Sequence, residues 1–171
     1  MAVRLREPTR NDVPLLDEWA ADLEFRGEFN DFGMPPHLRA SEPDDKPLID
    51  ATHGTLIIDD EAGTPVGSID WRPMMYGPPP KSMAWQLGIS LVPTARGRGY
   101  GSEALRLAVA YLFEHTPVNR IEGSCDVENV ASQRMLEKAG FMFEGMNRGA
   151  QFRRGSYHDL RLYSVLRSDK P

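Results

Sequence analysis

The feature that most constrains this chain is a glycine-rich segment, Arg96-Gly97-Arg98-Gly99-Tyr100-Gly101. The apolar stretch 83–92 before it predicts a strand, and leucine and valine recur with helical spacing over 102–115 after it. Glycines between a strand and a helix let the backbone turn tightly and direct its amides at a ligand. The segment therefore indicates a site for a phosphate at a helix N-terminus, or else a flexible turn between the two elements.

The spacing of these glycines excludes two common nucleotide-binding loops. The segment lacks the Gly-Lys-Ser/Thr ending of a P-loop. It also lacks the G-x-G-x-x-G spacing of a dinucleotide-binding fold.

The remaining periodicity predicts an α/β fold. Strands are expected at 3–6, 56–58, 65–71, 83–92, 121–127, 141–146 and 157–166, helices at 13–23, 102–115 and 129–139, and loops at 27–47 and 74–81. Gly140 is expected to end the 129–139 helix as a left-handed cap, with Phe141 making the accompanying apolar contact. This order predicts a single domain over residues 1–171, with a mixed central β-sheet flanked by helices.

The composition narrows the class of protein. The 171 residues are 40% hydrophobic and 26% charged, as in a globular domain. A net charge of −5 argues against a general nucleic-acid binder. Cys125 is the only cysteine and is expected to be a buried small hydrophobe, and no metal site is expected because the histidines lack ligand spacing. No apolar run approaches the roughly 20 residues that span a bilayer, so a cytoplasmic protein without membrane contact is expected.

A second motif, over residues 129–141, resembles that of a known family. Asn129-Val130-Ala131-Ser132 is followed by Leu136-Glu137-Lys138-Ala139-Gly140-Phe141. Together with Arg96-x-x-Gly99-x-Gly101, it resembles the second motif and the acyl-CoA pyrophosphate loop of the GNAT superfamily of N-acetyltransferases. Leu5-Arg6-Glu7-Pro8-Thr9 and the ending over 159–167 resemble its RimJ/RimL branch, which acetylates protein N-termini and includes antibiotic- and small-amine-modifying relatives. The resemblance covers nearly the whole chain, apart from residues 27–54.

The resemblance implies an acetyl-CoA-dependent enzyme whose sheet splays at the strand before the pyrophosphate loop. Leu91 and Val92 would offer backbone groups to the pantetheine, and a backbone amide of this strand, that of Leu91 or a neighbour, would stabilise the thioester oxygen. The loop would bind the pyrophosphate through the backbone amides of Arg96, Gly97, Arg98, Gly99, Tyr100, Gly101 and Ser102.

On the second motif, the resemblance implies that Asn129 hydrogen-bonds the pantetheine and that Ser132 lies near the thioester sulfur. Lys138 would approach the nucleotide. Each residue also has a structural interpretation. Asn129 fits a helix N-cap, Ser132 fits a helix surface, and Lys138 suits the C-terminal end of a helix dipole.

Two departures from the family pattern affect the chemistry. Leu136 stands where many relatives carry a tyrosine acid, which leaves Ser132 beside the leaving thiolate. Strand 84–90 has no carboxylate where many relatives place a glutamate base, and Gln86 cannot accept a proton at pH 7. The general base is therefore unassigned among Glu24, Glu28, Asp31, Asp70, His53 and His115.

The expected acceptor pocket is aromatic and acidic. Phe25, Glu28, Phe29, Trp71 and Tyr76 are expected to border it, which suits a cationic, partly apolar amine. An amphipathic helix with a charged outer face explains residues 23–32 equally well.

The acceptor is expected to be a protein N-terminal α-amine or a small amine, including an antibiotic. Two alternatives stay open. The donor could be succinyl-CoA or another acyl-CoA, for which Arg26, Arg72 or Arg148 could bind a donor carboxylate, or the chain could be a non-catalytic acyl-CoA sensor. Relatives are often dimers, and residues 74–76 fit either a homodimer interface or a pocket lid.

Overall fold

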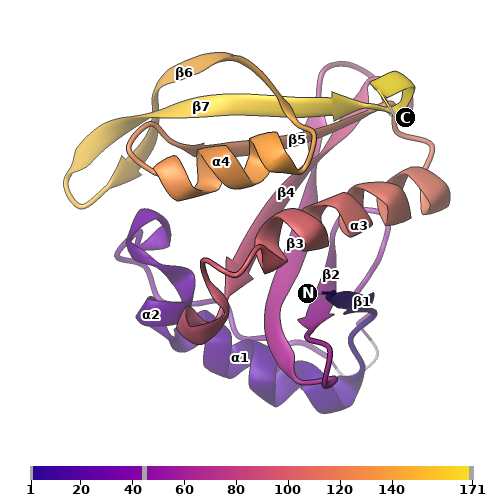
Figure 1. Cartoon of the computed structure of the whole chain (residues 1–171), viewed down its shortest axis with the longest axis vertical. Helices are drawn as coiled ribbons and strands as arrows, with labels where there is room; N and C mark the ends of the chain where they lie inside the picture. The colour runs from indigo at the N-terminus through magenta and orange to yellow at the C-terminus, as the bar shows by residue number, and fades with distance from the viewer. Residues whose placement is uncertain (1, 44–45, 170–171) are drawn as a thin grey trace.

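The computed structural model describes residues 2–43 and 46–169. Its centre is a seven-stranded sheet in the order β1-β2-β3-β4-β5-β7-β6 (Figure 1). The strands are β1 (Arg4–Arg6), β2 (Gly54–Asp59), β3 (Pro65–Met75), β4 (Met83–Leu91), β5 (Arg120–Asp126), β6 (Met142–Arg153) and β7 (Ser156–Leu166). All neighbours are antiparallel except β4 and β5, which run parallel. The predicted mixed sheet flanked by helices is confirmed.

Two groups of helices flank the sheet. The α-helices are α1 (Val13–Ala21), α2 (Leu23–Arg26), α3 (Tyr100–His115) and α4 (Val130–Lys138), and the 3-10 turns are η1 (Arg10–Asp12), η2 (Glu28–Asn30), η3 (Arg39–Ser41), η4 (Pro93–Ala95) and η5 (Arg167–Asp169). Helix α3 packs against β1, β3 and β4, and α4 packs against β5 and β6 (Figure 1). In the part of the chain that the structure describes, no helix has the length and apolar character to cross a membrane.

The main core lies between α3 and the sheet. Ile69, Leu105 and Leu112 are fully buried there. A second, smaller cluster joins Leu16 and Trp19 of α1 to Phe25 of α2. The rings of Trp19 and Phe25 stack with 4.7 Å between their centroids, so the two short helices form one unit.

Strands β3 and β6 extend furthest beyond their predicted ends. Strand β3 runs to Met75, two residues into the predicted 74–81 loop, because Met74 and Met75 pair with β4. Strand β6 runs to Arg153 instead of ending at Met146. Its register against β7 shifts between Asn147 and Gln151, so its outer half lacks the regular alternation that would have predicted it. The predicted connection 27–47 contains η2 and η3, and its residues 44–45 lie outside the described ones.

Strands β4 and β5 part halfway along their length. Their pairing ends at Leu87 and Gly123. Strand β4 continues beside β3 to Leu91, and β5 continues beside β7 to Asp126. The sheet is therefore open between the outer halves of β4 and β5, as the resemblance implied.

The C-terminal end of α4 closes as predicted. Gly140 has a φ of +92°, and the Phe141 N–H donates to the Leu136 carbonyl at 3.1 Å. Phe141 is buried, which completes the cap. Cys125 is also buried, as expected, and this burial raises the pKa of its thiol to about 11.

Candidate active site

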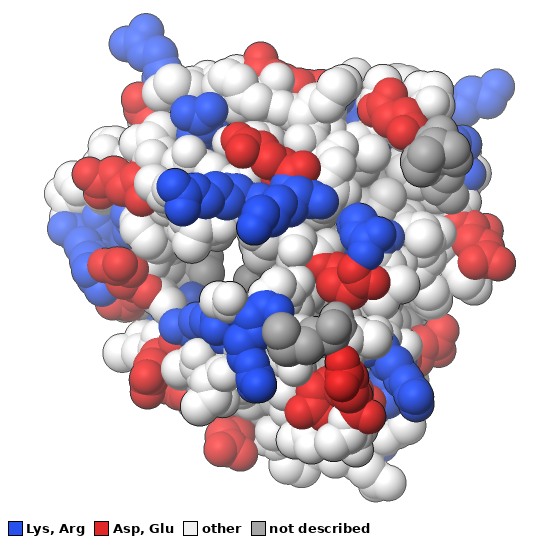
Figure 2. Space-filling view, viewed as in Figure 1, with Lys and Arg blue, Asp and Glu red and all other residues white. Residues whose placement is uncertain are grey.

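A cavity of about 490 Å³ lies where the sheet opens. It combines the glycine-rich loop, the end of β4, one side of α4 and the α2–η2 segment. Figure 2 shows Lys and Arg side chains gathered on both sides of a hollow between α4 and the loop before α3. The lining residues are Phe25, Arg26, Gly27, Glu28, Phe29, Asn30, Ile89, Ser90, Leu91, Arg96, Gly97, Gly99, Gly101, Ser102, Asn129, Ala131, Ser132, Arg134, Met135 and Lys138.

The glycine-rich loop leaves its backbone open to this cavity. Gly97 and Gly99 have φ values of +72° and +82°, which side chains rarely adopt. A Cβ atom on either residue would meet nothing within 4 Å, so free space lies beside the backbone. Gly99 is the N-cap of α3, and the first-turn amides that follow it have no acceptor within the helix. These amides and the positive end of the helix dipole suit an anionic pyrophosphate.

The side chains of this loop serve the fold. Arg96 donates from Nε to the Leu91 carbonyl at 3.1 Å, and from Nη2 to the carbonyls of Glu24 at 2.5 Å and Phe25 at 3.0 Å. The Arg98 guanidinium lies over the ring of Tyr100, whose side chain is buried in the core. Arg98 and Tyr100 do not line the cavity, so their available contribution to a ligand is through the backbone.

The end of β4 directs backbone amides into the opening between β4 and β5. The Val92 N–H donates to the Val66 carbonyl at 2.9 Å, and the Val92 carbonyl accepts from Ala95 at 2.9 Å. Because amides alternate in direction along a strand, the Leu91 N–H points away from β3 and into the opening. The prediction for Leu91 fits this geometry. The prediction for Val92 does not, because both of its backbone groups are engaged and it lies outside the cavity lining.

Helix α4 presents Asn129, Ser132 and Lys138 to the cavity. The Asn129 Oδ1 accepts from the Ser132 N–H at 3.0 Å, so Asn129 caps the helix with its oxygen and still has its NH₂ group to donate. Leu136 is buried in the core over Gly123. Arg134 also lines the cavity and was not predicted. Its spacing of four residues from Lys138 would have placed both cations on the same face of the helix.

Three of the predicted acceptor residues line the cavity and two do not. Phe25, Glu28 and Phe29 lie along its α2–η2 wall. Trp71 is packed into the core beside Gly54, because odd-numbered residues of β3 face α3. Tyr76 lies beyond the end of β3, where its hydroxyl donates to Glu122 at 2.5 Å. The predictions for Trp71 and Tyr76 therefore need correction.

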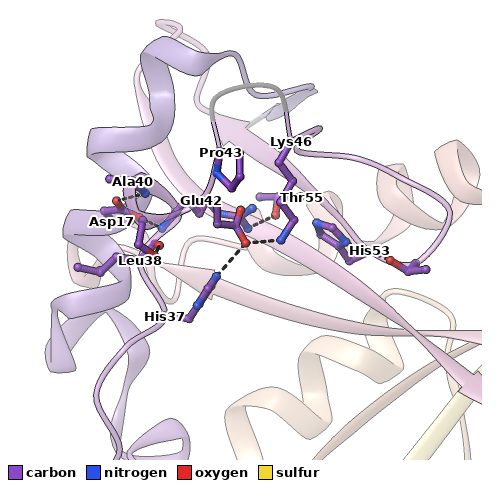
Figure 3. A network of polar contacts seen from close by, with 12 residues as sticks. Asp17, His37, Leu38, Ala40, Glu42, Pro43, Lys46, His53 and Thr55 are labelled. Carbon is purple, nitrogen blue, oxygen red and sulfur yellow. Dashed lines mark hydrogen bonds and ion pairs between the residues drawn. The ribbon is translucent and has the colours of Figure 1, made fainter.

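A second cavity, of about 500 Å³, shares Phe25, Arg26 and Ser90 with the first. It lies under α1 and the η3 segment, over the outer-facing residues of β3 and β4. Its remaining lining residues are Leu16, Trp19, Ala20, His37, Arg39, Glu42, Lys46, His53, Ser68 and Asp70. In Figure 3, Lys46 and His37 both contact the Glu42 carboxylate. These two contacts lower the pKa of the Glu42 carboxyl to about 2.

Asp70 is the one β3 carboxylate in this second cavity, within the described residues. Its Oδ1 accepts from Thr55 Oγ1 at 2.5 Å, and Thr55 Oγ1 accepts from Arg39 Nη2 at 2.5 Å. Half of the Asp70 side chain, 53%, is open to the cavity. Desolvation by the surrounding protein raises the pKa of Asp70, and the hydrogen bond from Thr55 and the charge of Arg39, whose Nη2 donates to Oδ1 at 3.4 Å, offset this in part.

The other base candidates are spread over the molecule. Glu28 lies 3.9 Å from Arg154, and Asp31 lies 3.7 Å from it, in exposed or half-buried ion pairs. His53 lines the second cavity with its Nδ1 3.1 Å from Asp50. The Nδ1 of His115 donates to the Tyr111 carbonyl at 2.8 Å, at the far end of α3. Glu24 lines neither cavity.

Comparisons with known proteins agree with this geometry. The probable N-acetyltransferase YjcK of Bacillus subtilis (strain 168) is 36% identical over 83 residues, 48% of this chain and 46% of the relative. The ribosomal-protein-serine acetyltransferase of Escherichia coli (strain K12) is 27% identical over 87 residues, 51% of this chain and 49% of the relative. The chain thus matches about half the length of these curated relatives.

A solved structure extends the likeness of the fold to the whole chain. The crystal structure of spermidine N-acetyltransferase from Vibrio cholerae, in complex with CoA and spermine, aligns with a TM-score of 0.75 at 17% identity. The alignment covers 98% of this chain and 96% of that one. Residues 2–142, which contain the opening between β4 and β5, the glycine-rich loop and the whole motif over 129–141, match a family described as an acetyltransferase (GNAT) domain. The chain therefore belongs to the GNAT family of acetyltransferases.

Proposed function

We propose that this protein transfers the acetyl group of acetyl-CoA directly to a primary amine, as a member of the RimJ/RimL-like branch. The observation that carries the proposal is the 490 Å³ cavity, in which the opening between β4 and β5 meets the amides at the start of α3 and the polar side of α4. Unpaired strand groups suit a pantetheine, and the helix N-terminus suits a pyrophosphate.

The residues of the cavity divide the chemistry of transfer among them. The Leu91 N–H donates to the thioester oxygen as negative charge develops on it. Ser132, half-buried on α4, hydrogen-bonds the sulfur of the leaving thiolate, whose thiol has an ordinary pKa near 8.5. Arg134 and Lys138 lie toward the nucleotide end and contribute positive charge.

The acceptor is a small amine or a protein N-terminal α-amine. An α-amine, with an ordinary pKa of about 7.7–8.0, needs a weaker base than a lysine of about 10.4. The names of similar proteins include both a ribosomal-protein acetyltransferase and a spermidine acetyltransferase. A succinyl donor is the second candidate, because Arg26 lines the donor cavity where a donor carboxylate would lie.

Thermal unfolding with acetyl-CoA, succinyl-CoA and ADP tests the donor. A ligand at 100 times its Kd stabilises the native state by about 2.7 kcal/mol, which shifts the Tm of a chain of this size by roughly 5–10 °C. We expect this shift with acetyl-CoA and not with ADP, followed by free thiol release when amines are added. A Tm shift with succinyl-CoA but not with acetyl-CoA would identify succinyl-CoA as the donor. No shift with either thioester would overturn the proposal.

A further inference from the structure

The second cavity contains the groups needed to hold an amine beside the opened strand. Asp70 lies on its floor, and its partner across β3 and β4 is Gly88. A Cβ atom on Gly88 would meet nothing within 4 Å, so there is free space over the strand next to the carboxylate. Gly88 is also the first residue of β4 beyond its last pair with β5. Asp70 therefore faces the point at which the sheet opens.

Ser90 connects the two cavities. It lines both of them and lies two residues beyond Gly88, about 7 Å along the strand. Its neighbour Leu91 carries the free amide that faces the donor. An amine held near Asp70 is thus on the opposite face of β4 from the core, and a short distance from the proposed thioester position.

Arg26, at the junction of the cavities, has one guanidinium nitrogen without a hydrogen bond to any described residue. Within the described part of the chain, its Nε is buried and has no hydrogen-bond partner. Its nearest carboxylate contact is Asp31, at 3.9 Å from Nη2, which is longer than a hydrogen bond. A buried guanidinium nitrogen without an acceptor is costly, and an anionic ligand group would satisfy it.

The charge of the second cavity argues against a polycation. Its lining includes Arg26, Arg39 and Lys46 against Glu42 and Asp70, an excess of one positive charge. Glu42 is engaged by Lys46 and His37 (Figure 3). Asp70 accepts from Thr55 and pairs with Arg39 at 3.4 Å through one oxygen, Oδ1, and 53% of its side chain stays exposed to a ligand. A ligand with one amine and one anionic group therefore matches these charges better than a polyamine does.

We propose that the second cavity binds the acceptor, and that the acceptor is an amine that also carries a carboxylate or phosphate, with its amine at Asp70 and its anion at Arg26. This inference rests on the proposed acetyl transfer. In the reaction, the ammonium gives one proton to Asp70, and the nitrogen lone pair forms the new N–C bond. The C–S bond breaks with its electrons going to sulfur, and the second amine proton passes to that sulfur to give the CoA thiol.

Matched acceptors test the class of substrate. Thiol release from acetyl-CoA is measured with the twenty common L-amino acids and their amides, with O-phosphoethanolamine and ethanolamine, and with spermidine. We expect the best anionic amine to exceed its neutral partner by about tenfold or more in kcat/KM, the effect of one charged hydrogen bond. Spermidine or a neutral amine used as well as the anionic ones would overturn this inference and leave acetyl transfer intact. Thiol release with none of the amines would count against both proposals.

Variants separate the two roles. Arg26→Gln is expected to raise KM for the anionic acceptor by about tenfold and to abolish the preference over its neutral partner, while Arg26→Lys retains part of it. Asp70→Asn is expected to lower kcat by about 100-fold or more and to remove the acid limb of the pH profile. Arg4→Gln, on the edge strand β1, is the control for loss of an exposed arginine. If Arg26→Gln still preferred the anionic acceptor over its neutral partner, the inference would be overturned. It would also be overturned if the wild type preferred succinyl-CoA to acetyl-CoA as the donor and Arg26→Gln lost that preference.

Discussion

Arg153 donates from Nη2 to the Oδ2 of Asp126 at 2.7 Å, and both side chains are buried, at 5% and 1% exposure. Asp126 ends β5, three residues before Asn129, and Arg153 ends β6. A second nitrogen of Arg153, Nη1, donates to the Phe29 carbonyl at 3.3 Å. One guanidinium thus joins the β6–β7 hairpin to β5 and to the α2–η2 wall of the first cavity.

Removing this arginine is expected to destabilise the protein strongly. Arg153→Ala leaves the buried Asp126 carboxylate with the Glu128 N–H at 2.8 Å and His158 Nδ1 at 3.5 Å but without its arginine, and the loss of a buried ion-pair partner costs about 3–5 kcal/mol. Urea unfolding measures the change, and Arg154→Gln, at the exposed turn between the strands, should stay within about 0.5 kcal/mol of the wild type. A loss below about 1 kcal/mol in Arg153→Ala would show that water enters the site and solvates Asp126.

Substitutions at Asn129 can separate capping from ligand binding. The Oδ1 of Asn129 caps α4, and aspartate is an equally good cap. Asn129→Asp should therefore keep the wild-type Tm, whereas Asn129→Ala should lose about 1 kcal/mol. Both should weaken acetyl-CoA binding, measured by calorimetry, because both lack the NH₂ donor. If Asn129→Asp bound acetyl-CoA with wild-type affinity, the role of Asn129 would be to cap α4 and not to bind the ligand.

Ser132 is expected to act on the leaving group. Ser132→Ala removes a hydrogen bond to a developing thiolate and should lower kcat by about tenfold, with a smaller change in the KM for acetyl-CoA. Steady-state thiol release measures both constants, with Ser168→Ala in the exposed turn η5 as the control. Equal kcat values for the two variants would remove Ser132 from the mechanism.

Acid is expected to weaken the pairing of β5, β6 and β7. Arg120 and Ser164 hydrogen-bond Glu144 and lower its pKa to about 2 from an ordinary 4.5. A lowered pKa means that the stabilisation is fully present above pH 4.5 and is lost as the pH falls toward 2. Glu144→Gln should cost up to about 1 kcal/mol at pH 7 and flatten the fall in Tm over this pH range. The exposed Glu114→Gln provides the reference curve, and identical slopes for both variants would contradict the prediction.

The local chemistry of the sequence predicted the donor side of the site well. Glycines at 97 and 99, the cap at Asn129 and the stop at Gly140 all act within a few residues of their own positions, so short-range rules describe them. Val92 was misassigned because its amide is used by Val66, on a strand 26 positions earlier in the sequence, and pairing of this kind depends on register.

The acceptor side of the site was harder to predict because it depends on which face of β3 is left uncovered by α3. Alternation along β3 separates Asp70 from Trp71, but periodicity alone does not say which face α3 covers. Part of the wall of the second cavity comes from the 27–47 connection, which has no periodic pattern to place Arg39 or Glu42. The tertiary contacts of this connection, such as the hydrogen bond from Arg39 to Thr55, determine where its side chains lie in the second cavity.

The three bonds of Arg96 all end on main-chain oxygens, those of Leu91, Glu24 and Phe25. Helix α2, whose Phe25 and Arg26 line both cavities, is therefore fastened to the donor loop by atoms that every amino acid possesses. The side chains that line the second cavity, such as those of Arg39 and Asp70, take no part in that attachment, so a scaffold of this kind can acquire new acceptors while its donor site stays the same.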